Sequence, residues 1–134
     1  MQKKIRKFKF GKLVRDKIVQ GIIAAGNKPN FRTLMTDEYV EELKKKVLEE
    51  AEELPKAKEN KEIIEEIADI EEAINNLLRV MGVQKYKVKK HQSKKNAERG
   101  SFKRRFYIES VEVESDSEWL KYYLAHPDKY PEIK

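Results

Sequence analysis

The chain has 134 residues, of which 40% are charged and 39% hydrophobic, and its formal net charge is +6. This length suits one domain, which we expect to comprise residues 1–134. The chain has no cysteine, which excludes disulfides and cysteine-ligated zinc or redox centres. It also has no apolar run of membrane-spanning length and no signal-peptide pattern, so we expect a cytoplasmic protein that does not bind a membrane.

The charges are segregated along the chain. Residues 1–35 carry ten Lys/Arg and one acid, and residues 36–78 carry fifteen acids and six Lys/Arg. Residues 79–105 carry eleven Lys/Arg and one acid, and residues 106–134 carry seven acids and three Lys. An acidic block between two basic blocks has two explanations. In the first, folding brings an acidic and a basic site together, which would suit a metal ion bound with a polyphosphate. In the second, the acidic and basic helices only neutralise each other's charge.

The first half of the chain predicts two helices after a basic N-terminal segment. Residues 3–11 alternate Lys/Arg with apolar residues, which indicates a short strand or an extended arm. Residues 12–26 predict a first helix that ends at a glycine. Residues 36–58 predict a second helix, with Thr36 as N-cap and with Pro55 as the residue that ends or kinks it.

The centre of the chain predicts two further helices. Residues 60–82 form a long amphipathic pattern that stops at Gly82. Because the joint before this helix is short, we expect the second and third helices to be antiparallel neighbours. Residues 83–100 predict a fourth helix, which is strongly basic.

The C-terminal part predicts one strand region and one short helix. Residues 102–114 alternate in polarity, which is typical of a strand or a small hairpin. Residues 115–127 predict a short terminal helix with Ser115 or Ser117 as its cap. The fold class that follows is mainly α: an antiparallel helical bundle of about four main helices, with minor β segments near the termini.

Four carboxylates fall on the apolar side of the second and third helices. At about 100° per residue, Glu50 lies near the middle of the second helix's apolar stripe and Glu53 at its edge. On the third helix Glu66 lies within the margin of the stripe and Asp69 just outside it. Each helix therefore contributes a carboxylate pair at i, i+3. If the apolar faces pack together, the four side chains converge.

Convergent carboxylates need a counter-charge. Like charges at this spacing repel, and burial of unpaired carboxylates is unfavourable. A divalent cation removes the conflict, and a ligand set made only of oxygen atoms favours Mg²⁺, or alternatively Mn²⁺. The other explanation is that these acids form ordinary surface ion pairs. Their candidate partners are Lys44, Lys45, Lys46 and Lys61.

Three motifs in this sequence resemble a known family. "EEAEEL" followed by "EEIAD" resembles the ExxE…ExxD signature of the MazG-like all-α NTP pyrophosphatases. The residues that match the signature are Glu50, Glu53, Glu66 and Asp69. "KLVRDKI" at residues 12–18 and "KKNAERGSF" at residues 94–102 resemble one branch of that superfamily, the phosphoribosyl-ATP pyrophosphohydrolase-like, house-cleaning group. The motifs occur in the expected order and span most of the chain.

Two positions depart from the pattern of that branch. Val19 stands where proline usually follows "RDKI", and Ser101 stands where a second glycine often follows the arginine. Neither position belongs to the carboxylate signature.

The resemblance implies an α-helical core and an active centre in which the four carboxylates bind Mg²⁺. It implies hydrolysis of a nucleoside triphosphate to monophosphate and pyrophosphate, and a homodimer or larger homo-oligomer. We take Glu53 as a candidate general base. The candidate substrate-binding residues are Lys12, Arg15, Asp16, Lys17, Asn76, Lys95 and Arg99. The cations among them suit phosphate oxygens, and we expect Asp16 to orient Arg15 or Lys17 or to contact the base.

Two other functions compete with this interpretation. The basic segment 85–105, with Tyr86 and two phenylalanines nearby, would suit a nucleic-acid-binding helical module. That function leaves the inward carboxylates unexplained, so nucleic acid is not the partner we expect. The other rival is a purely structural helical interaction protein. Within the enzyme interpretation, the sequence leaves open whether the substrate is a standard or modified (d)NTP or phosphoribosyl-ATP.

Overall fold

The structure is a computed structural model that describes residues 3–134, and every regular element in that range is a helix. The elements are α1 (Ile18–Ala24), α2 (Thr36–Glu53), the 3₁₀ helix η1 (Leu54–Lys56), α3 (Asn60–Met81), α4 (Lys85–Arg99) and α5 (Glu118–Ala125). The chain divides into two compact units, Met1–Lys94 and Lys95–Lys134, which are described separately here. The mainly α prediction is confirmed, whereas the single domain of residues 1–134 stays a prediction.

The predicted β segments are wrong. Neither 3–11 nor 102–114 contains a strand, and no strand occurs elsewhere between residues 3 and 134. Apolar side chains of the first segment stay uncovered, as Ile5 is 92% and Phe8 73% exposed. The physical reason is that polarity alternation favours a strand only when a neighbouring strand pairs with it, and neither segment has one.

Helix α1 is shorter than the sequence predicts, since it begins at Ile18 rather than at Lys12. Its first turn contains no acid. Lys17 stands at the N-cap and makes no side-chain capping hydrogen bond, and residues 12–17 lie outside the helix.

Helix α2 begins and ends close to the predicted positions. Thr36 is its first helical residue, so the prediction of Thr36 as N-cap is wrong by one position, and Met35 precedes the helix without a side-chain cap. Asp37 and Glu38 lie in the first turn, where negative charge favours helix formation. At the other end the chain tightens into η1 around Pro55, which confirms that this proline ends the α-helix.

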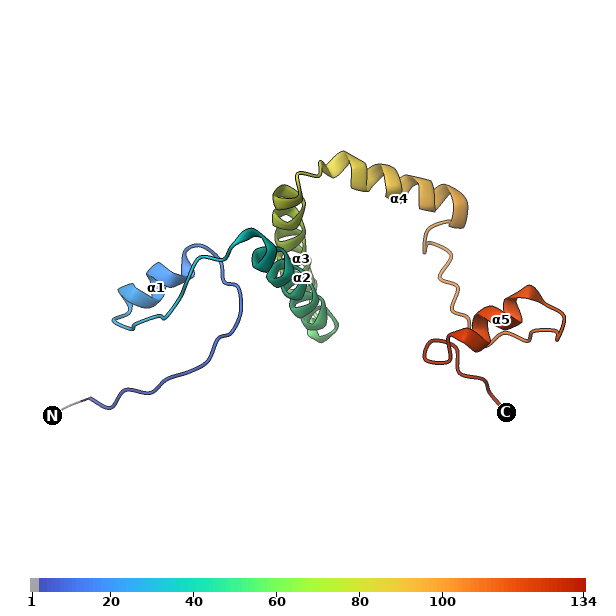
Figure 1. The fold of residues 1–134 in the computed structure, drawn as a ribbon, viewed down its shortest axis with the longest axis horizontal. Helices are drawn as coiled ribbons and strands as arrows, with labels where there is room; N and C mark the ends of the chain where they lie inside the picture. The colour runs from blue at the N-terminus through green and yellow to red at the C-terminus, as the bar shows by residue number, and fades with distance from the viewer. Residues whose placement is uncertain (1–2) are drawn as a thin grey trace. The chain divides into compact units, whose positions relative to one another are not determined.

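The main helix packing is between α2 and α3, which form an antiparallel hairpin closed by η1 (Figure 1). Leu43 of α2 and Ala73 of α3 are buried, with 3% and 5% of their surface exposed. Each of the two packed helices thus contributes one buried apolar residue. This hairpin confirms the predicted antiparallel pair and positions the carboxylates.

The predicted bundle of four helices is not formed by the described residues, because helix packing centres on α2 and α3 alone. Helix α1 has only seven residues and buries none of them. Helix α4 has no buried residue either, and its apolar residues are too few to form a continuous face. Without an apolar stripe, α4 has no hydrophobic reason to pack on the hairpin.

The remaining helix ends follow the sequence. Gly82 ends α3 in the left-handed conformation, with φ of 69°, and its N–H donates to the carbonyl of Arg79. Ser117 caps α5 by accepting a hydrogen bond from the N–H of Trp119 at 3.2 Å, so Ser117 is the cap rather than Ser115. Among residues 3–134, no helix has the length and apolar composition needed to cross a membrane.

Candidate metal centre

Three carboxylates from the two packed helices converge. Glu50 of α2 and Glu66 and Asp69 of α3 each offer an oxygen, and these three atoms lie within 4.8 Å of one another. All three side chains are half-buried, and that of Glu50 is only 16% exposed. The packing of α2 on α3 therefore brings together three of the four signature carboxylates, at a spacing that could hold a metal ion.

Glu66 is the carboxylate with the least favourable surroundings. Its Oε2 atom is shielded from solvent and has no hydrogen-bond partner among the described residues. Burial raises the pKa of Glu66 above its ordinary value, and the negative charges of Glu50, Asp69 and Glu53 raise it further. A carboxylate with these neighbours needs a proton or a cation.

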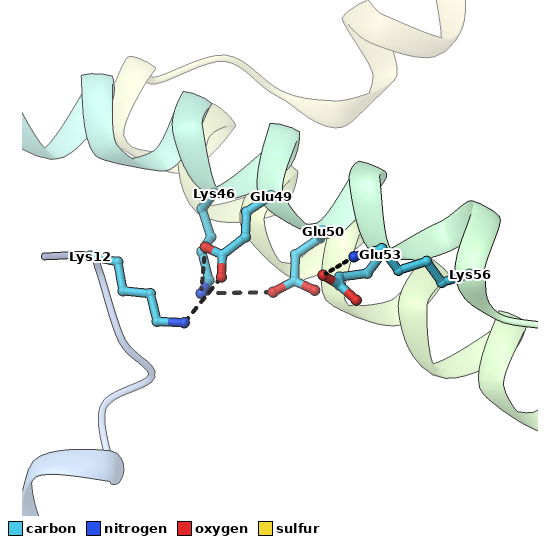
Figure 2. Close-up of polar contacts among 6 residues, drawn as sticks. All are labelled: Lys12, Lys46, Glu49, Glu50, Glu53 and Lys56. Atoms are coloured by element: carbon cyan, nitrogen blue, oxygen red, sulfur yellow. Dashed lines mark hydrogen bonds and ion pairs between the residues drawn. The ribbon is translucent and has the colours of Figure 1, made fainter. Parts of the chain in front are cut away.

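Lysines lie on the α2 side of the cluster (Figure 2). Lys46 Nζ lies 3.3 Å from Glu49 Oε2 and 3.7 Å from Glu50 Oε1, and Lys12 Nζ lies 3.1 Å from Glu49 Oε1. Burial opposes ionisation of Glu49, but hydrogen bonds from Lys12 and Lys46 outweigh it and lower the pKa of Glu49. The alternative of simple ion pairing is thus partly realised, because Lys46 pairs with an acid of the cluster.

Arg15 reaches the α3 side of the cluster. Its Nη2 donates to Asp69 Oδ1 at 2.7 Å. Together with Lys12 this brings two cations of the "KLVRDKI" segment to the carboxylates of the hairpin. Guanidinium and ammonium groups of this kind pair with anionic oxygens.

Glu53 lies outside the triad. It is an exposed residue, and its Oε1 lies 3.4 Å from Lys56 Nζ (Figure 2). It lines a shallow hollow of about 140 Å³ together with Glu66; the other lining residues are Lys56, Ala57, Glu62 and Glu65. Glu53 therefore adds negative charge beside Glu66 without joining the three ligand atoms.

The other candidates of the first unit are not gathered at the triad. Asp16 and Lys17 are exposed, and no ion pair within residues 3–134 joins either of them to another side chain. The Asn76 amide donates to the carbonyl and the carboxylate of Glu72, at 2.8 and 3.1 Å, and its oxygen accepts from Arg79. Asn76 is thus engaged within α3.

Lys95 and Arg99 belong to the second unit and lie on the exposed C-terminal half of α4. They occupy consecutive turns of that helix, four residues apart. Their assignment as substrate-binding residues stays a prediction.

Glu49 is not among the site residues predicted from the sequence, because at about 100° per residue it points away from the apolar stripe of α2. It takes both Lys12 and Lys46 as partners. The pairing of Glu49 with Lys46 could have been predicted from their spacing. Lys46 precedes Glu49 by three residues and Glu50 by four, and residues at these spacings lie on one face of a helix. The long-range partner Lys12 has no such local signal.

The donor set fits a hard divalent cation. All three converging atoms are carboxylate oxygens, and the shielded Oε2 of Glu66 has no partner that would compete for it. Three oxygen ligands also leave coordination positions for water or phosphate. Chemically, the site could hold a divalent cation whose remaining coordination positions are open.

Comparisons of the chain with protein-family models, with curated proteins and with solved structures found no match.

Proposed function

We propose that this protein is a Mg²⁺-dependent nucleotide pyrophosphohydrolase, which hydrolyses a standard or modified (d)NTP, or a related nucleotide, to the monophosphate and pyrophosphate. The observation that carries the proposal is the convergence of Glu50, Glu66 and Asp69 with the unpartnered oxygen of Glu66. The resemblance of the three sequence motifs to the MazG-like pyrophosphatases supplies the reaction class.

The triad would hold the ion, with Mn²⁺ as an alternative to Mg²⁺. When bound, the ion would neutralise phosphate charge and polarise a phosphoryl oxygen. The carboxylates would fix its position because α2 and α3, which carry them, pack against each other. Without such a cation the same carboxylates would repel a triphosphate.

Lys12 and Arg15 are the phosphate ligands that the geometry supports best. Both already lie against the acidic cluster, on Glu49 and Asp69. Both ion pairs are partly exposed, so each is weak and exchangeable. In the proposed complex each cation would exchange its carboxylate partner for a phosphate oxygen. Arg15 would make the bidentate contact that guanidinium geometry allows.

Glu53 is the candidate proton acceptor. It lies beside Glu66 in the same hollow but outside the triad, so ion binding would leave its oxygens free. In the proposed reaction a water oxygen bonds to the α-phosphorus and the α–β anhydride bond breaks. Pyrophosphate leaves, and the water proton passes to the carboxylate.

We also propose a homodimer or larger homo-oligomer built on the hairpin. Leu48 of α2 and Ile64 and Ile67 of α3 are 60%, 65% and 44% exposed. Among residues 3–134 these two helices make the main packing contact, and large exposed apolar side chains on them suit a surface that another copy can cover. Light scattering after size exclusion tests this, and Leu48→Lys with Ile64→Lys should yield a monomer.

The decisive experiment incubates purified protein with a panel of standard and modified (d)NTPs and phosphoribosyl-ATP, in Mg²⁺ and in EDTA. Pyrophosphate and monophosphate are both measured. We expect Mg²⁺-dependent pyrophosphate release that Glu50→Gln and Glu66→Gln abolish. Glu52→Gln, an exposed substitution on the same helix with the same charge change, should keep it.

The products separate the competing functions. Orthophosphate in place of pyrophosphate would keep the metal centre but move the cleavage position. The enzymatic function would be rejected if no substrate were turned over and Mg²⁺ did not change the thermal stability. The carboxylates would then be part of a structural helix interface. The ranking of the panel would distinguish a house-cleaning enzyme from a phosphoribosyl-ATP hydrolase.

A further inference from the structure

Among the described helices, α4 (Lys85–Arg99) has the highest net positive charge. Among its fifteen residues six are lysine and one is arginine, against the single acid Glu98. It buries no residue. The ion pairs of the described chain involve Lys12, Arg15, Arg32 and cations of α2 and η1, but none from α4.

Three of these lysines form a row. At about 100° per residue, Lys87, Lys90 and Lys94 fall within about 60° of one another around the axis. All three side chains are exposed. At about 1.5 Å per residue the row is about 10 Å long, and a nucleic-acid strand presents a phosphate about every 3.4 Å along its axis. The row therefore faces about three phosphates.

This row is distinct from the cations assigned to the nucleotide. At about 100° per residue, Lys95 lies about 110° and Arg99 about 150° around the helix from the middle of the row. The row therefore uses a different face of α4.

An anionic partner along the row would stabilise this helix. Lysines at i, i+3 and i+4 repel one another, and an unpacked helix of this length is marginal in water. A polyanion along the row would remove the repulsion. A membrane is a poor candidate, because Tyr86, Val88 and Ala97 do not share one face and leave no apolar stripe to insert.

We propose that the row Lys87–Lys90–Lys94 is a binding surface for the phosphate backbone of nucleic acid, in addition to the proposed hydrolysis. Tyr86 is 63% exposed and flanks the row, where its ring is placed to stack on an unpaired base. Such a surface would recognise the charge and spacing of the phosphates, so we expect binding without sequence specificity.

The test measures binding of the full-length protein to a labelled single-stranded DNA, its RNA counterpart, the DNA duplex and phosphatidylserine vesicles, over a salt series. The triple substitution Lys87→Gln, Lys90→Gln, Lys94→Gln should make the slope of log K against log salt shallower by about 2 to 3. At about 0.15 M salt the affinity should fall roughly 100-fold. Pyrophosphate release should not change.

Two variants keep the test decisive. The first is a control that removes the same charge from exposed positions outside α4, and it should retain binding. It carries the triple substitution Lys28→Gln, Lys58→Gln, Lys61→Gln. Arginine at the three row positions should restore binding, and circular dichroism checks that the glutamine variant keeps its helices. Equal losses in the row and control variants, an unchanged salt slope, or stronger row-dependent binding to vesicles than to nucleic acid would overturn the proposal. Duplex and single-strand data, with Tyr86→Ala, identify which form the surface prefers.

Discussion

Arg15 Nη2 lies 2.7 Å from Asp69 Oδ1, although the two residues are 54 positions apart in the chain. This contact joins the basic N-terminal segment to the carboxylate triad of the hairpin. One of the three carboxylates that could bind a metal ion, Asp69, is therefore already paired with a positively charged side chain. A bound metal ion would compete with the guanidinium for the same oxygen.

We predict that Arg15→Ala binds Mg²⁺ more tightly and turns substrate over more slowly. The first effect follows because the competing charge at Asp69 is gone. The second follows from a lost charge-assisted hydrogen bond of about 1.5–3 kcal/mol, which is about 10- to 150-fold in kcat/KM. Titration calorimetry and steady-state kinetics measure the two. Weaker Mg²⁺ binding would show that Arg15 organises the site instead, and Arg15→Lys is the charge-preserving control.

Mg²⁺ should stabilise the folded protein through the triad. At a hundred times its dissociation constant the ion adds about 2.7 kcal/mol to the free energy of unfolding. Glu66→Gln should lose this gain, yet melt above wild type in EDTA, because the amide removes a shielded charge that has no partner. Differential scanning calorimetry with and without Mg²⁺ measures both effects, with Glu52→Gln as control. Equal Mg²⁺ stabilisation of wild type and Glu66→Gln would rule out the triad as the metal site.

The raised pKa of Glu66 predicts a specific pH dependence. Between the ordinary glutamate pKa and the raised value, the folded state binds more protons than the unfolded state. Glu66 therefore makes the metal-free protein less stable as pH rises through this window, and its penalty persists above it. Urea unfolding in EDTA across this pH range should show the decline. Glu66→Gln should remove this contribution, and an unchanged slope would exclude Glu66 as its source.

Leu43 is the main buried residue of the hairpin, with 3% of its surface exposed. Leu43→Ala should lower the free energy of unfolding by about 2–5 kcal/mol, because it loses burial and opens a cavity between α2 and α3. Leu48 on the same helix is the matched control. Since Leu48 is exposed, Leu48→Ala should destabilise only at protein concentrations where copies associate. A comparable loss in dilute protein would place Leu48 in the core of a single chain.

Arg32 holds the start of α2 through a bidentate pair with Glu38, with contacts of 2.7 and 2.5 Å. The hydrogen bond from Arg32 lowers the pKa of Glu38. This contribution to stability is present above the unfolded glutamate pKa and is lost as pH falls through the lowered value. Arg32→Gln should return the pKa of Glu38 toward its ordinary range in an NMR titration. A Glu38 pKa that stays low would assign the shift to the helix N-terminus instead.

The sequence alone determined the parts of this protein that depend on local chemistry. Periodicity located α2, α3 and α4, while Pro55, Gly82 and Ser117 marked helix ends, because backbone conformation and capping depend on residues a few positions apart. The helical periodicity of about 100° per residue also placed Glu50 and Glu66 on the packed side of their helices. These properties repeat within one or two helical turns.

The tertiary structure decided what depends on distant residues. The strands at 3–11 and 102–114 were predicted from alternation and failed because no neighbouring strand pairs with them. Only the packing of α2 on α3 distinguished Glu53 from Glu50. The two residues lie about one helical turn apart, and only the packed structure shows that Glu50 joins the triad while Glu53 is exposed. The pairing of Arg15 with Asp69 likewise required the folded chain, because no local pattern joins residues so far apart.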